Sequence, residues 1–167
     1  MITKTSLLAT RALLCLAEDR QGLAIPPRSI ALQLGESPAY MAKVLRSLVK
    51  AGILRAEHGS KGGVRLNKRP GEITLLAIVE ACQGAIVASH CQDVDDSSPT
   101  CAFHQAAIEL RQGIIGVLSR WNLEQLARSP GPTECLPGGK QCIMAGFPLS
   151  LAATRVEKRE QKRDAMS

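Results

Sequence analysis

The sequence predicts a mainly α-helical fold with one short two-stranded ribbon and a long helix near its C-terminal end. Apolar residues recur at helical spacing in five stretches, and glycines separate two short β-forming segments between residues 53 and 66. The core must be aliphatic, because aromatic residues make up 2% of the chain and hydrophobic residues 45%. The length of 167 residues fits one ordinary domain with an appendage.

The first three helices are predicted by apolar spacing and by residues that begin and end helices. The first runs from about Lys4 to Asp19. The second opens at Pro26 and Pro27, because proline suits a first helical turn, and it stops at Gly35. The third has Ser37 as its N-cap and keeps helical spacing through Lys50.

A short ribbon follows the third helix. Ile53 and Leu54 begin its first strand, the run GSKGG from Gly59 to Gly63 is a flexible turn, and Val64–Leu66 return as the second strand. Helix, helix, tight turn, helix and a glycine-tipped ribbon form the winged helix-turn-helix arrangement, in which the third helix enters the major groove of DNA. We therefore expect a winged helix-turn-helix DNA-binding domain.

The second half of the chain predicts two further helices. Thr74 is the expected N-cap of a fourth helix that ends at Gly84. A loop of about sixteen residues follows, and loops of that length are usually functional or disordered. The last predicted helix runs from about Ala102 to Ala127, and we expect it to be a long dimerisation helix.

The charge distribution divides the chain into three regions. Residues 1–70 hold twelve Lys and Arg against four Asp and Glu, whereas residues 71–128 hold three against seven. A basic region joined to an acidic one is typical of a polyanion-binding module attached to a module that does not bind the polyanion. We therefore expect a DNA-binding region at 1–70, a sensor loop with dimerisation helices at 71–128, and an irregular, mobile tail at 129–167.

Candidate DNA contacts lie on the second and third predicted helices and on the ribbon, which is the wing. Polar and basic side chains at these places can contact phosphates or base edges. Tyr40 is expected to be exposed and to hydrogen-bond a phosphate, and the alternative is that it is a partly buried packing residue. The candidates are Arg28, Ser37, Tyr40, Lys43, Arg46, His58, Ser60, Lys61 and Arg65.

Three runs of sequence resemble one known family. SPAYMAKVLRSLVKAGIL, HGSKGGVRL and EITLLAIVEACQG are similar to the Rrf2 family of winged helix-turn-helix transcriptional regulators, whose members include IscR and NsrR. The resemblance covers about residues 2–127. It implies a homodimer built on the long helix, a palindromic operator in double-stranded DNA, and often an iron–sulfur cluster in the loop before that helix. At Ala42 and His58 the chain departs from IscR, which has glutamate and arginine there, so a different operator is expected.

The resemblance also implies a ligand set for a 2Fe–2S or 4Fe–4S cluster. Cys91 matches the family's first loop cysteine, and Cys101 and His104 match its last cysteine and histidine. The middle cysteine is absent, so a further ligand is needed, and Cys135 and Cys142 of the tail are the candidates. Two alternatives stay open: Cys91 and Cys101 sense oxidants by forming a disulfide, or a small ligand or protein partner controls the regulator. Cys15 and Cys82 are expected to be small buried hydrophobes.

The function expected from these observations is a dimeric regulator of transcription, acting as a repressor, whose operator affinity follows a cluster or the cysteine redox state. The alternative is a cluster-free winged-helix dimer that docks a metabolic enzyme or another protein. No enzyme is expected, because the sequence shows no nucleophile–base pair or metalloenzyme motif. No apolar stretch is long enough to span a membrane, and no leader is evident, so a cytoplasmic protein is expected.

Overall fold

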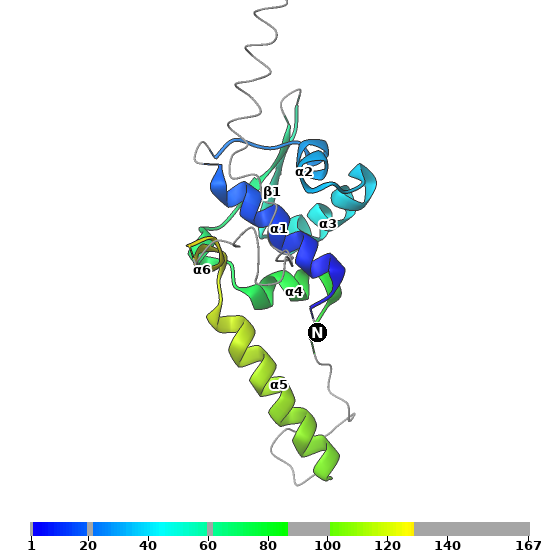
Figure 1. Cartoon of the computed structure of the whole chain (residues 1–167), viewed down its shortest axis with the longest axis vertical. Coiled ribbons are helices and arrows are strands. Elements are labelled where there is room, and N and C mark those ends of the chain that lie inside the picture. The colour runs from blue at the N-terminus through cyan, green and yellow to red at the C-terminus, as the bar shows by residue number, and fades with distance from the viewer. Residues whose placement is uncertain (1, 20–21, 60–61, 87–100, 129–167) are drawn as a thin grey trace, which may run out of the picture.

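The computed structural model describes residues 2–19, 22–59, 62–86 and 101–128, and these form a mainly helical body with one small sheet (Figure 1). Its elements are α1 (Lys4–Glu18), α2 (Pro27–Leu34), α3 (Pro38–Lys50), β1 (Leu54–Glu57), β2 (Gly63–Leu66), the 3-10 turn η1 (Pro70–Glu72), α4 (Leu75–Gln83), α5 (Ala102–Arg120) and α6 (Leu123–Arg128). The predicted winged helix-turn-helix is confirmed. We call α1 to α3 with β1 and β2 the reading head.

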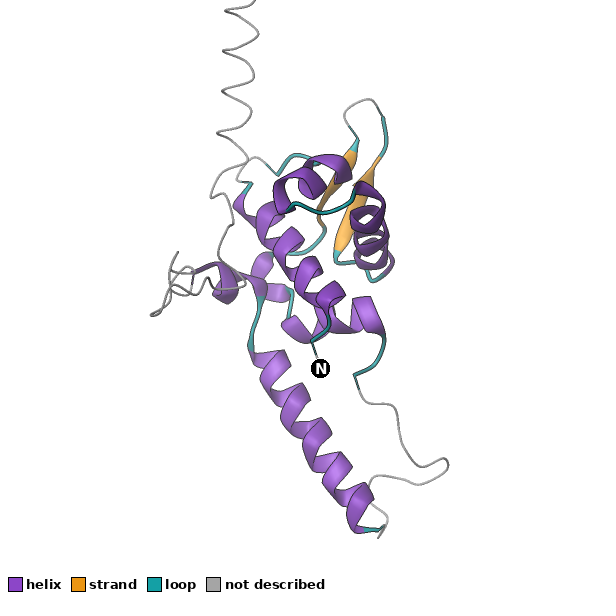
Figure 2. Cartoon of the chain, turned by 45° about the vertical axis from the view of Figure 1, so that its right-hand side comes forward, coloured by secondary structure: helices purple, strands orange, loops and turns teal. Residues whose placement is uncertain are grey.

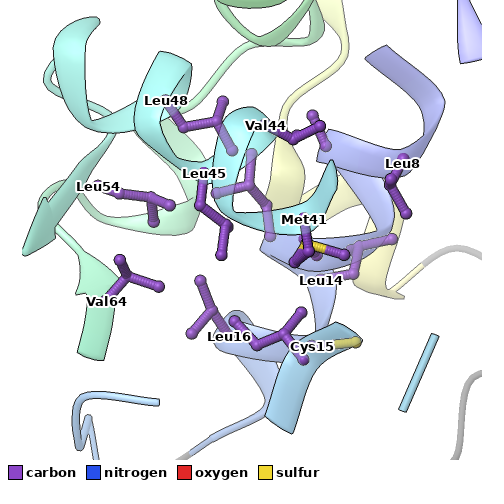
Figure 3. Packing of buried hydrophobic residues seen from close by; sticks show 14 of the residues in the cluster. Leu8, Leu14, Cys15, Leu16, Met41, Val44, Leu45, Leu48, Leu54 and Val64 are labelled. Atoms are coloured by element: carbon purple, nitrogen blue, oxygen red, sulfur yellow. The ribbon is translucent and has the colours of Figure 1, made fainter. Parts of the chain in front are cut away.

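The core of the reading head lies between α1 and α3. Met41, Val44, Leu45 and Leu48 of α3 are buried, and Figure 3 shows Met41 beside Leu14 of α1. Burial of each such aliphatic side chain stabilises the fold by about 2 kcal/mol. Their spacing of three and four residues leaves the opposite side of α3 free for polar residues.

The turn between α2 and α3 depends on a glycine and on a cap. Gly35 adopts the left-handed conformation, with φ 67° and ψ 29°, which glycine reaches without steric cost. The backbone N–H of Glu36 then donates to Ala31 O at 2.9 Å. Ser37 begins α3 as predicted, because its Oγ accepts from the backbone N–H of Tyr40 at 3.2 Å.

The wing is the antiparallel pair β1 and β2, drawn in orange in Figure 2. Its register pairs Leu54 with Leu66 and Ala56 with Val64. Ile25 extends the sheet by one bridge, because its backbone exchanges two 2.9 Å hydrogen bonds with Val64. Gly63 was predicted to lie in the flexible turn, but it belongs to β2. The backbone of Ile25 passes close to it, because a Cβ on Gly63 would lie 2.5 Å from Ile25 C.

The predicted single helix over residues 102–127 is wrong, since the chain breaks it into α5 and α6. Trp121 is extended, with φ −91° and ψ 128°, and Asn122 begins the second helix. Asn122 and Gln125 form a capping box, in which each side chain accepts from the backbone N–H of the other residue. The sequence Asn-x-x-Gln is therefore a helix-start signal inside an otherwise continuous helical pattern. In Figure 1, α5 extends away from the body while α6 lies against it.

One hydrophobic cluster joins the two halves of the described chain. Ile73, Ile78 and Leu123 are buried together with the core of α1 and α3. α4 packs on both α1 and α3, and α6 packs on α1. No described helix combines the length and the apolar character needed to cross a membrane.

Candidate nucleic-acid interface

The basic side chains of α3 share its exposed side. Lys43, Arg46 and Lys50 are exposed, whereas Met41, Val44, Leu45 and Leu48 are buried. The cations recur every three or four residues, so they occupy one face of the helix. Lys50 also lies in the last turn, where a cation interacts favourably with the helix dipole. A rigid helix with cations on its free face suits entry into a DNA groove flanked by phosphates.

Tyr40 differs from its prediction. It is half-buried and packs on the hydrophobic core instead of being exposed. Its hydroxyl lies 2.9 Å from Thr5 Oγ1 on α1. The ring therefore ties the first turn of α3 to the first turn of α1, and this contact uses one of the hydrogen-bonding positions of the hydroxyl.

The wing carries its charges on one face. Arg55 pairs in register with Arg65, and Glu57 lies two residues further along the same face. Arg65 Nε lies 2.6 Å from Glu57 Oε1, and both side chains are partly exposed. An exposed pair of this kind adds little stability, but the carboxylate offsets one of two facing guanidinium charges.

The remaining predicted contacts fall into two groups. Arg28 at the start of α2 and His58 after β1 are exposed. Ser60 and Lys61 lie outside the described residues. Three further basic residues, which were not predicted as contacts, are exposed on or just after the wing: Arg55, Lys68 and Arg69. Strand alternation could have found Arg55, because it shares a face with Arg65.

An uncovered apolar stripe runs along α5. Only His104 and Leu118 of its nineteen residues are buried, whereas Phe103, Leu110 and Val117 are exposed to 73%, 64% and 47%. The stripe consists of Phe103, Ala107, Leu110, Ile114 and Val117, and the exposed Trp121 directly follows the helix. Its alternating steps of four and three residues are the spacing of a coiled-coil seam.

Cys101 and His104 lie in the first turn of α5. Cys101 is exposed and is the N-cap residue, and His104 is 4% exposed. Thiolate and imidazole both suit iron–sulfur clusters, so these two side chains fit by donor type. They do not complete a site, because the described part of the chain contains no group of three His, Cys, Asp or Glu able to hold a metal. Cys91, Cys135 and Cys142 lie outside the described residues.

Two other cysteines have environments that suppress thiolate chemistry. Burial, followed by the nearby carboxylate of Glu18, raises the pKa of Cys15 to about 12. Burial also raises the pKa of Cys82, which is half-buried against the core. Burial of Cys15 is confirmed, and Cys82 is covered less completely than predicted.

Comparison with known proteins identifies relatives over most of the chain. The Rrf2 family model, described as an iron-dependent transcriptional regulator, matches residues 2–129. The HTH-type transcriptional regulator IscR of Photorhabdus laumondii is 27% identical over 130 residues, which cover 77% of this chain and 79% of that protein.

Solved structures agree with the sequence comparison. The structure of CymR, described as the global cysteine regulator of B. subtilis, is similar with a TM-score of 0.61 and 26% identity, over 76% of this chain and 95% of that one. The oxidized form of Staphylococcus aureus CymR is similar with a TM-score of 0.60 and 26% identity, over 77% and 96%. These relatives do not favour the alternative of a docking module.

Proposed function

The chain belongs to the Rrf2 family of transcriptional regulators, and from that premise we propose that it is a cytoplasmic homodimer, not an enzyme, that represses transcription by binding a pseudo-palindromic operator. Residues 1–70 are the DNA-binding region and residues 71–128 carry the signal and the dimer contact. The exposed row of Lys43, Arg46 and Lys50 on a helix anchored by its opposite face carries this proposal.

In the proposed complex α3 enters the major groove and the wing meets the neighbouring phosphates or minor groove. Ser37, Lys43 and Arg46 lie along α3, and Arg28 flanks it from α2. His58, Ser60, Lys61 and Arg65 contribute from the wing, to which the structure adds Arg55. Tyr40 serves mainly to position α3, because its hydroxyl already pairs with Thr5.

The second subunit covers the apolar stripe of α5. Phe103, Leu110 and Val117 of the stripe are among the most exposed large hydrophobic residues described, and Ala107 and Ile114 between them are partly exposed. A two-fold dimer built on this helix presents two reading heads to two half-sites, about one DNA turn apart.

The proposed switch is centred on Cys101. This residue starts α5, so a change in the bonding of its sulfur acts on the first turn of the proposed dimer helix. One form of the switch is an iron–sulfur cluster held by Cys91, Cys101 and His104, which would make operator affinity depend on iron and redox state. The other is a thiol pair, Cys91 and Cys101, that loses two electrons and two protons to an oxidant such as a peroxide and forms a disulfide. The similarity to IscR supports the first form, and the similarity to an oxidized CymR supports the second.

Salt-dependent DNA binding tests the reading surface. An operator is first selected from a random duplex pool, and its affinity is then measured against salt concentration. The plot of log affinity against log salt has a negative slope. Lys43→Ala and Arg46→Ala should each make this slope less steep by about 0.9, as expected for one lost phosphate contact. Arg120→Ala is the matched control, since it removes the same charge from an exposed position at the end of α5. Equal slopes in all four proteins would contradict the proposed surface.

Spectra and metal analysis of protein purified without air test the switch. Visible absorbance with iron and sulfide, lost in Cys101→Ala and kept in Cys82→Ala, would support the cluster. A colourless protein whose DNA affinity responds to peroxide, again only with Cys101 present, would support the thiol pair. If Cys101→Ala leaves both absorbance and redox-dependent affinity unchanged, the proposed switch is wrong.

A further inference from the structure

The break between α5 and α6 is the place where α5 joins the body. α5 projects from the body in both overall views, and its C-terminal end lies at the body (Figures 1 and 2). Its two buried residues are His104 in the first turn and Leu118 in the last. The attachment of α5 to the body therefore includes residues 118–123, and α5 also packs on α4.

Two backbone hydrogen bonds hold this junction to the start of α4. Leu75 N donates to Trp121 O at 2.8 Å, and Leu123 N donates to Ile73 O at 2.9 Å. Between these bonds Thr74 and Asn122 form an isolated antiparallel bridge. The extended backbone at Trp121 and Asn122 is required for this pairing, because a continuous helix would use the same N–H and C=O groups internally.

The side chain of Asn122 stabilises the extended junction. Gln125 N donates to Asn122 Oδ1 at 2.9 Å, and Asn122 N donates to Gln125 Oε1 at 3.0 Å. This reciprocal pair starts α6 and opposes continuation of α5 through the break. Leu123, directly after it, is completely buried and anchors α6 in the core.

The junction reaches the reading head through a short and packed connection. Ile73, which accepts from Leu123, is 1% exposed and belongs to the same hydrophobic cluster as α1 and α3. η1 precedes it and joins it to the wing, and α6 packs on η1. A Cβ placed on Gly71 of η1 would lie 2.7 Å from Glu124 Oε2, which shows how closely α6 approaches this connection.

We infer that Asn122 is a positioning residue that sets the angle between α5 and the reading head, and through it the half-site separation that the dimer accepts. The inference rests on the proposed function, in which two chains join along α5. At about 1.5 Å per residue, the nineteen residues of α5 form a lever of about 28 Å. A tilt of about 7° at its fixed end moves the other end by about 3.4 Å, which is the rise of one base pair.

Parallel selections from a random duplex pool test the inference. The wild type and three variants are each used to select binding sites, which are then sequenced. Asn122→Ala removes the cap and inserts the strongest helix former, whereas Asn122→Asp keeps an oxygen acceptor for Gln125 N. Gln112→Ala is the control, since Gln112 is exposed on α5 and lies outside the apolar stripe.

The wild type, Asn122→Asp and Gln112→Ala should select the same half-sites at one separation. Asn122→Ala should select the same half-sites at a separation shifted by about one base pair, or over a broadened range. A purely structural role would instead lower melting temperature and affinity without moving the separation, and that outcome overturns the inference. If Asn122→Ala does not fold, Gln125→Ala is judged by the same criterion. Failure of the wild type to select any paired half-sites would contradict the proposed function itself.

Discussion

The hydroxyl of Tyr40 on α3 lies 2.9 Å from Thr5 Oγ1 on α1, so the start of the proposed recognition helix is hydrogen-bonded to the start of the first helix. The two residues are 35 positions apart in the sequence. Ser6, next to Thr5, donates from its Oγ to Gln83 Oε1 at 3.2 Å. The first turn of α1 therefore contacts both α3 and the end of α4.

Removing either hydroxyl should destabilise the protein. Tyr40→Phe and Thr5→Val should each lower the free energy of unfolding by about 1 kcal/mol, because each breaks one part-buried hydrogen bond. The double variant should lose less than the sum of the two, since the bond is already broken in either one. Urea unfolding measures all three. Strictly additive losses would show that the two hydroxyls do not interact.

The apolar stripe on α5 predicts the effect of a charge at its centre. Leu110→Glu removes one exposed leucine from each subunit of the proposed dimer contact. Burial of each leucine is worth about 2 kcal/mol, so the variant should raise the dimer dissociation constant about a thousandfold. Sedimentation measures the dissociation constant. Gln112→Glu adds the same charge beside the stripe and should leave the dimer intact. An unchanged dimer in Leu110→Glu would place the subunit contact elsewhere.

The cysteines should differ sharply in reactivity. With a pKa of about 12, Cys15 is thiolate in about one molecule in ten thousand at pH 8, and it is buried as well. Iodoacetamide should therefore modify the exposed Cys101 long before Cys15, and Cys82 should also react slowly because burial raises its pKa. Peptide mass spectrometry gives the order of labelling. In urea all three should react at similar rates, and rapid native labelling of Cys15 would contradict the structure.

Glu18 predicts a pH dependence of stability. Burial raises its pKa above the ordinary 4.5, so its stabilising contribution is fully present below pH 4.5 and is lost as pH rises through the higher folded value. The charged carboxylate also lies at the C-terminal end of α1, which disfavours a negative charge. Glu18→Gln should therefore increase the free energy of unfolding by about 0.5 kcal/mol at pH 7.

The same comparison has to be made in acid. Below pH 4.5 the gain from Glu18→Gln should disappear, because the wild-type carboxyl is then neutral as well. Glu80→Gln, at an exposed position of α4, is the control and should change stability little at either pH. Thermal unfolding at several pH values measures both variants. A gain that persists in acid would point to an effect other than charge.

Local signals in the sequence alone determined several helix ends and the two sides of α3. Gly35, Ser37 and Thr74 mark helix ends by the conformations and hydrogen bonds that their own residues provide, and the structure has those ends where expected. The buried and exposed sides of α3 likewise follow from a spacing of three and four residues. These features need only neighbours in the sequence, so the winged helix-turn-helix and its basic helix could be predicted.

Only the tertiary structure decided where distant segments meet. The partner of Tyr40, the bridge of Ile25 with Val64, and the break at Trp121 all depend on backbone or side-chain groups supplied from elsewhere in the chain. The break is the clearest case, because the apolar pattern continues through Trp121 without interruption. The backbone groups of Ile73 and Leu75 instead form hydrogen bonds with Leu123 N and Trp121 O, and these bonds replace those of a continuous helix. A periodic pattern records which residues are apolar, whereas the choice between helix and extended chain at one position depends on which partners the folded core brings there.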